Sequence, residues 1–228
     1  MTGDDSKPLR EPVFNAPWTA VLMAAVLILC FLGQGGLSES QFYDWTLRPT
    51  AVLAGDPTGL FTSMFLHGGW AHVLMNAAFC LAFGAPVARL LGTDARGASA
   101  TFGLYIVCGL LAGAGYVALH TSSDAPVVGA SGAVAGLMGA ASRLIATPGQ
   151  VGPLRSRPVI SMALAWLVVN LLVAVFGFPG SGGAAIAWEA HLAGYVAGLL
   201  LIGPTARLVG VGIQAVDSTP RKDDAPWT

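Results

Sequence analysis

Six apolar runs dominate this sequence, and each is long enough to cross a hydrocarbon core about 30 Å thick. They span residues 17–36, 68–91, 98–119, 129–147, 158–178 and 186–209. Only 10% of the 228 residues are charged, whereas a soluble domain carries about a quarter. A globule of this size cannot hide so much apolar surface. The runs therefore predict an all-α polytopic membrane protein, a bundle of six transmembrane helices.

Basic residues predict how the bundle is oriented. Ten of the eleven Lys and Arg residues flank the runs on one side, and Arg48 is the exception. Cytoplasmic loops are enriched in Lys and Arg, so both termini are expected in the cytoplasm. The chain then has short cytoplasmic tails at 1–16 and 210–228 around one membrane domain at 17–209. The segment 37–57 is external, and its aromatic residues are typical of a loop lying in the membrane interface.

The overall charge and the cysteines exclude several roles. A net charge of −1 gives no electrostatic footprint for nucleic acid, so no nucleic-acid partner is expected. Cys30, Cys80 and Cys108 all lie inside apolar runs, where a cysteine behaves as a small buried hydrophobe. The sequence predicts no metal site and no cofactor. The oligomeric state stays open.

Polar residues mark one end of three of the predicted spans. With the N-terminus inside, the second, fourth and sixth spans all start at the outer surface, and each carries polar residues near its start. Such groups are unfavourable in lipid unless they pair or face water. Their shared depth predicts one site at the outer end, and its residues are His67, His72, Asn76, Ser131 and His191.

Ser131 lies between glycines, which leave its hydroxyl accessible to a substrate carbonyl. Taken alone, Gly129-Ala-Ser-Gly132 is better explained as a helix-packing segment. Two stripes of small residues change this interpretation, one formed by Gly132, Gly136 and Ala140 and the other by Ala190, Gly194 and Gly198. Stripes with this four-residue spacing let two helices approach closely. If they face each other, they bring Ser131 beside His191, as a nucleophile and its base require.

His72 and Asn76 are four residues apart, on one helical face, and could both donate hydrogen bonds to one oxygen. His67 is interpreted as a structural residue that braces the external loop. Hydrolysis below the membrane surface needs water, so we expect a hydrophilic cavity open to the external side, lined by the histidines and Asn76.

Taken together, these residues resemble the rhomboid intramembrane serine proteases in their six-span bacterial form. The resemblance rests on His67-Gly-Gly-Trp-Ala-His-Val-Leu-Met-Asn76, Gly129-Ala-Ser-Gly132 and Ala190-His-Leu-Ala-Gly-Tyr-Val-Ala-Gly198. It implies a catalytic dyad of Ser131 and His191. It also implies oxyanion stabilisation by His72, Asn76 and the Ser131 backbone N–H, transmembrane protein substrates cut near the outer face, and a location in the bacterial inner membrane.

The sequence departs from this family at two places. Many relatives carry an aromatic residue four positions after the serine, where this chain has Ala135, and a Trp-Arg pair where this chain has Thr58-Gly59. Three alternatives stay open. They are an inactive relative that binds transmembrane helices, a small transporter, and a metalloprotease using His67, His72 and His191, although no His-Glu-x-x-His helix occurs.

Overall fold

The computed structural model describes residues 16–145, 147, 149–177 and 186–212, and the regular elements of this part are all helices. The predicted tails, 1–16 and 210–228, lie almost entirely outside the described residues. The elements in chain order are α1 (Trp18–Gly33), η1 (Gln34–Gly36), α2 (Glu39–Asp44), α3 (Pro49–Leu53), α4 (Thr58–Thr62), η2 (Ser63–Phe65), α5 (Trp70–Leu91), α6 (Ala95–Leu119), α7 (Ser131–Ser142), α8 (Arg157–Phe176) and α9 (Trp188–Leu208).

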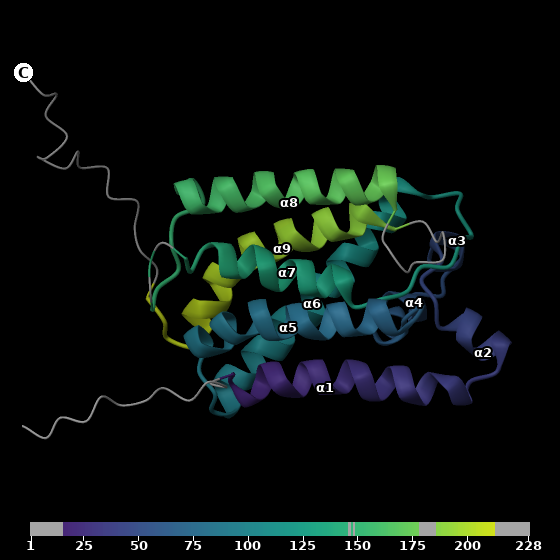
Figure 1. Ribbon diagram of the computed structural model, residues 1–228, viewed down its shortest axis with the longest axis horizontal. Helices are drawn as coiled ribbons and strands as arrows, with labels where there is room; N and C mark the ends of the chain where they lie inside the picture. The colour runs from purple at the N-terminus through teal and green to yellow at the C-terminus, as the bar shows by residue number, and fades with distance from the viewer. Residues whose placement is uncertain (1–15, 146, 148, 178–185, 213–228) are drawn as a thin grey trace, which may run out of the picture.

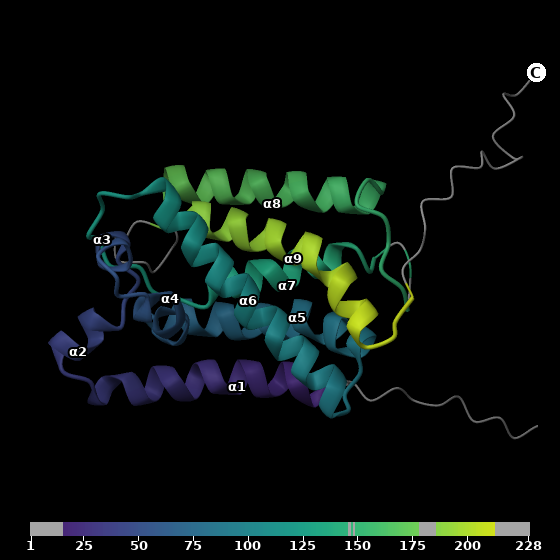
Figure 2. The same cartoon turned by 180° about the vertical axis from the view of Figure 1, so that it is seen from behind.

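The long helices form a bundle in which α7 is central, with α1 and α8 at opposite edges (Figure 1). Helices α5, α7 and α9 all begin at the same end of the bundle, where α2, α3 and α4 also lie. Seen from behind, α6 runs obliquely across the bundle (Figure 2), and it packs against both α7 and α9. The prediction of an all-α polytopic membrane bundle is confirmed.

Each of the six predicted apolar runs overlaps one of the long helices, with ends that differ by a few residues. Among the described residues, four segments are long and apolar enough to cross a membrane by themselves, namely Trp18–Gly36, α5, α6 and α8. Helices α7 and α9 fall outside this set for physical reasons. Helix α7 has only 12 residues, and α9 is the least apolar of the long helices, since it carries Glu189, His191 and Arg207. Helix α7 is surrounded by other helices, so it meets protein rather than lipid.

The sequence placed the end of the fourth span at Thr147, and this prediction is wrong. Helix α7 ends at Ser142, which makes it about 18 Å long at 1.5 Å per residue. The Ser142 hydroxyl donates to the Gly139 carbonyl at 2.7 Å, and the Arg143 side chain turns back to the Gly152 carbonyl at 2.8 Å. These bonds satisfy the polar groups at the helix end. From Gly132 onward every residue of α7 is buried, as expected for a helix apolar on all sides.

The predicted contact between the two small-residue stripes is confirmed. A methyl group added at Gly194 would overlap the Gly132 carbonyl, and one added at Gly198 would overlap the Gly136 carbonyl. The backbones of α7 and α9 thus touch directly, which only glycine permits at these positions. This contact fixes the relative height of the two helices that carry Ser131 and His191.

Substituting Gly194→Ala is expected to lower the free energy of unfolding by about 1–3 kcal/mol, because the added methyl group forces α9 away from α7. Thermal unfolding of the purified protein in detergent measures this. Gly103→Ala in α6 is the matched control, since no atom lies within 4 Å of its added methyl group. Equal melting temperatures for the two variants would contradict the backbone contact.

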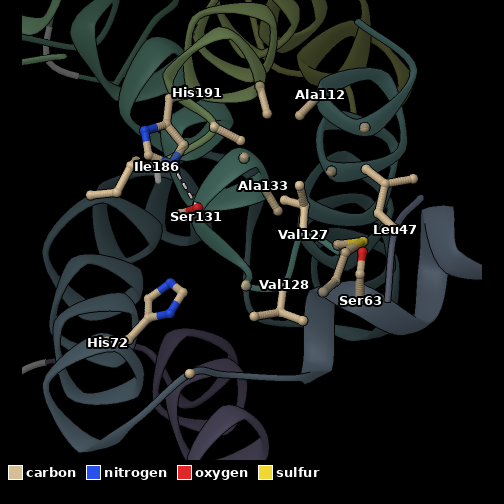
Figure 3. Close-up of a pocket in the computed structure, with 18 of the residues that line it drawn as sticks. Leu47, Ser63, His72, Ala112, Val127, Val128, Ser131, Ala133, Ile186 and His191 are labelled. Carbon is tan, nitrogen blue, oxygen red and sulfur yellow. Dashed lines mark hydrogen bonds between the residues drawn. The ribbon is translucent and has the colours of Figure 1, made fainter. Parts of the chain in front are cut away.

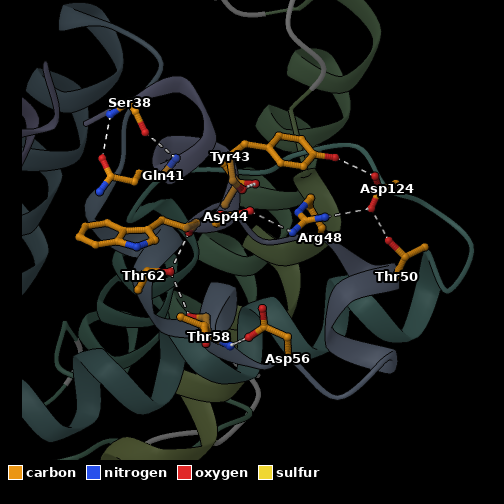
Figure 4. Close-up of polar contacts among 12 residues, drawn as sticks. Ser38, Gln41, Tyr43, Asp44, Arg48, Thr50, Asp56, Thr58, Thr62 and Asp124 are labelled. Carbon is orange, nitrogen blue, oxygen red and sulfur yellow. Dashed lines mark hydrogen bonds and ion pairs between the residues drawn. The ribbon is translucent and has the colours of Figure 1, made fainter. Parts of the chain in front are cut away.

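The segment between α1 and α5 is held by polar contacts at its surface (Figure 4). Asp124 accepts hydrogen bonds from Tyr43 at 2.7 Å, from Arg48 at 3.5 Å and from Thr50. The bonds from Thr50 and Tyr43 lower the pKa of the Asp124 carboxyl. Residues 43–50 are therefore tied to the segment that leads into α7. The interfacial position of the loop 37–57 stays a prediction.

Candidate active site

A cavity of about 200 Å³ opens at the end of the bundle where α5, α7 and α9 begin. Ser131, His72 and His191 line it, together with apolar residues of α6 and of the segment between α1 and α5. His191 and His72 approach Ser131 from two different helices (Figure 3). The cavity expected from the sequence is present, but its walls are more apolar than predicted. His67 and Asn76 are not among its lining residues.

Ser131 is the first residue of α7, and backbone hydrogen bonds to the segment between α1 and α5 hold the chain that precedes it. Leu47 and Val127 exchange two backbone hydrogen bonds of 2.9 Å, and the Gly129 N–H donates to the Ser63 carbonyl at 2.9 Å. The first N–H groups of a helix have no acceptor within it. The Ser131 N–H therefore lies beside its own hydroxyl at the positive end of the helix dipole, where a developing negative charge is stabilised.

His191 forms a direct hydrogen bond with Ser131. The distance from its Nε2 to the Ser131 Oγ is 2.7 Å, which is within the reach required of a general base. Its Nδ1 lies 2.9 Å from Oδ1 of Asn170, on α8. The glycine contacts between α7 and α9 produce this pairing, as the two stripes predicted. A serine proton can therefore pass to the histidine without movement of either helix.

His72 packs directly against Gly129. A methyl group added at Gly129 would lie 2.6 Å from Nε2 of His72, and the Gly129 φ of +124° also favours glycine. Glycine thus lets the His72 ring approach the start of α7. Asn76 lies one turn further along α5, where it is buried and its Nδ2 donates to the His72 carbonyl at 3.1 Å. The oxyanion roles predicted for His72 and Asn76 stay predictions.

His67 is buried beside the site. Its backbone N–H and carbonyl both bond to the Gln34 side chain, at 3.0 and 2.7 Å, and its ring meets the His72 ring edge to face at 5.1 Å. It thus links the end of α1 to the start of α5 rather than contacting the cavity. Its predicted role in bracing the external loop stays a prediction.

Stability is expected to fall as the pH drops from about 6.5 to about 4, because burial lowers the pKa of His67 from 6.5 to about 4. Between these values the unfolded chain binds a proton at this side chain and the folded chain does not. Protonation therefore favours unfolding in this window. Melting temperatures measured from pH 7 to pH 4 should fall less steeply in His67→Gln than in the wild type. Parallel curves would contradict a neutral, buried His67.

Sequence reasoning missed two residues of α8 that contact His191. Asn170 Oδ1 lies 2.9 Å from its Nδ1, as described above. The Trp166 ring lies 6.2 Å from the His191 ring and stacks on the Tyr195 ring at 6.4 Å. Ala135 packs in the same cluster, with Met138 and Tyr195. An apolar run gave no reason to single out one Asn and one Trp, although a buried amide in a membrane span is itself a signal.

The metalloprotease alternative requires a set of converging ligands. Among the described residues, no three His, Cys, Asp or Glu side chains lie where they could hold one metal ion. His67, His72 and His191 are therefore not arranged as a ligand set.

The fold and the cavity define a polytopic, all-α integral membrane protein with a hydrogen-bonded serine and histidine inside the bundle. The model of the rhomboid domain matches residues 54–207, which is more than half of the chain, and the chain belongs to the rhomboid family. Members of this family are generally serine intramembrane proteases that act on transmembrane substrates. A search of curated proteins found no match.

Proposed function

We propose that this protein is an intramembrane serine endopeptidase that cleaves transmembrane helices near the outer membrane face. The observation that carries the proposal is the 2.7 Å hydrogen bond between the Ser131 hydroxyl and His191 Nε2, inside a cavity within the bundle. An inactive relative needs no such pair. Family membership supports the same activity.

The reaction proposed is acyl transfer. Ser131 Oγ attacks the substrate carbonyl carbon as its proton passes to His191 Nε2, and the histidine then returns this proton to the leaving amine. Water, activated by the same histidine, hydrolyses the acyl enzyme and restores Ser131. The Ser131 N–H and His72 stabilise the oxyanion, and Asn76 supports His72 through the His72 carbonyl. No step uses a cofactor.

The substrate must present an unwound segment to this cavity. An intact helix engages its carbonyl groups in internal hydrogen bonds, so helix-breaking or small residues near the scissile bond favour entry. The distribution of basic residues in the sequence supports an orientation with both termini in the cytoplasm, which would put the cavity at the external face. For a bacterial protein this membrane is the inner membrane.

Reaction with a fluorophosphonate probe tests the proposal, because the probe reacts with activated serines. We expect the wild-type protein in detergent to gain the mass of one probe less HF, because the serine oxygen displaces fluoride, and Ser131→Ala to gain none. Ser63→Ala is the matched control, since Ser63 lines the same cavity without a histidine bonded to its hydroxyl. It should react like the wild type. A folded wild-type protein that does not react would support the inactive relative instead.

A further inference from the structure

Asn170 is an unusual residue for its position in the bundle. Helix α8 has most of its side chains at the surface, and within it only Val159 and Asn170 are buried. Burying an amide is unfavourable unless its polar atoms are hydrogen-bonded. Both ends of the Asn170 amide are bonded, with 2.8 Å from Nδ2 to the Trp166 carbonyl and 2.9 Å from Oδ1 to His191 Nδ1. The side chain is thus held at the face of α8 that meets the active site.

These two contacts fix the direction of every hydrogen bond in the chain of residues. The Trp166 carbonyl can only accept, so the NH₂ group of Asn170 must face it and Oδ1 must face His191. Oδ1 cannot donate, so His191 must carry its proton on Nδ1. A neutral imidazole has one N–H, and its Nε2 therefore has a free lone pair. This is the nitrogen that accepts the Ser131 hydroxyl at 2.7 Å.

We propose that Asn170 is a positioning residue that holds His191 in its reactive tautomer, so that Ser131, His191 and Asn170 form a three-residue chain across α7, α9 and α8. The proposal rests on the protease function proposed above. Asn170 takes no proton in the reaction. The serine proton passes to Nε2 and on to the leaving amine, while the Asn170 oxygen stays bonded to the Nδ1 proton throughout. Its dipole also stabilises the imidazolium formed between these steps.

Trp166, one turn before Asn170 on α8, restrains the same ring from the side. Its ring lies 6.2 Å from the His191 ring at an angle of 40°. Helix α7 offers only Ala135 at the position where many relatives have an aromatic residue under the histidine. In this protein α8 therefore supplies both the hydrogen bond to Nδ1 of His191 and the aromatic neighbour of its ring.

The kinetic test replaces Asn170 with leucine, which is similar in size but cannot accept a hydrogen bond. For cleavage of a transmembrane peptide in detergent, we expect Asn170→Leu to lower kcat by roughly 10- to 100-fold with KM nearly unchanged. Val159→Ala is the matched control, because it loosens the other buried contact of α8 without touching His191. It should keep kcat within about threefold of the wild type. An equal loss in both variants would indicate a purely structural role and overturn the proposal.

Asn170→Asp provides a second variant should the leucine variant fail to fold. The carboxylate still accepts from Nδ1 and adds a negative charge that favours the imidazolium, so the acid limb of the pH profile of kcat should move to higher pH. An acid limb that stays in place would count against contact between residue 170 and the catalytic base.

The tautomer itself can be measured without catalysis. The chain has four histidines, so ¹⁵N-histidine NMR in the Ser131→Ala background resolves His191 once each signal is assigned by substitution. We expect a protonated Nδ1 and a bare Nε2 at neutral pH, and a shift toward the Nε2–H form in Ser131→Ala/Asn170→Leu. An unchanged tautomer overturns the proposal. A wild-type protein without protease activity would overturn the proposed function instead and leave this measurement standing.

Discussion

His191→Ala is expected to lower kcat for cleavage of a transmembrane substrate by roughly 10⁴-fold or more. The reason lies in the proton of Ser131. A neutral serine hydroxyl is a weak nucleophile, and His191 Nε2, at 2.7 Å, is the only side-chain group among the described residues that is hydrogen-bonded to it. Without the imidazole the proton has no acceptor during attack. Cleavage of a fluorogenic transmembrane peptide, followed at saturating substrate, measures the effect.

His120→Ala is the matched control for this variant. His120 pairs with Glu189 at 3.2 Å near the start of α9, but it does not line the cavity. Its loss should leave kcat within about threefold of the wild type. Should His191→Ala cleave within tenfold of the wild-type rate, His191 would not be the base.

His72→Ala is expected to lower kcat by roughly 10²- to 10³-fold with little change in KM, because an oxyanion donor acts on the transition state and not on the bound substrate. His72 is suited to this role because it lines the cavity beside Gly129 and Ser131. Steady-state kinetics separate the two parameters.

His72→Gln tests whether the loss comes from hydrogen bonding or from packing. Glutamine can donate to an oxyanion from a similar position, so it should recover part of the rate if His72 acts as a donor. Since Gly129 packs against His72, a packing role would instead lower the melting temperature and the rate together in both variants. That pattern would contradict an oxyanion role.

The positions of the long helices could be predicted from the sequence, because the lipid environment restricts which segments can cross it. Spans in lipid must be long, apolar and internally hydrogen-bonded, and this requirement locates all the long helices. It says less about helices that meet only protein. Helix α7 ends five residues before the predicted Thr147, because Ser142 and Arg143 find carbonyl partners inside the fold. The Arg143 side chain also donates to the Leu199 carbonyl on α9 at 3.0 Å, and a partner so far away in the sequence leaves no local signature.

The candidate site also has a part that the sequence predicted and a part that depends on contacts between helices. Small-residue stripes predicted the approach of α7 and α9, and hence the pairing of Ser131 with His191. This was possible because the four-residue spacing of small residues can be recognised in each helix separately. Asn170 and Trp166 had no comparable pattern, since their role depends on which face of α8 meets α9. The expected cavity lining by Asn76 was not found, since Asn76 is buried within the bundle and its amide bonds to the His72 carbonyl of α5.

Cleavage in a membrane tests the central claim most directly. The purified wild-type protein and Ser131→Ala would be reconstituted in liposomes with a panel of single-span substrates whose outer halves contain small and helix-breaking residues. The products would be identified by mass spectrometry. We predict that the wild type cuts at least one substrate within the outer half of its transmembrane segment and that Ser131→Ala cuts none. Equal cleavage by Ser131→Ala, or no cleavage by a wild-type protein that is folded, would contradict the account.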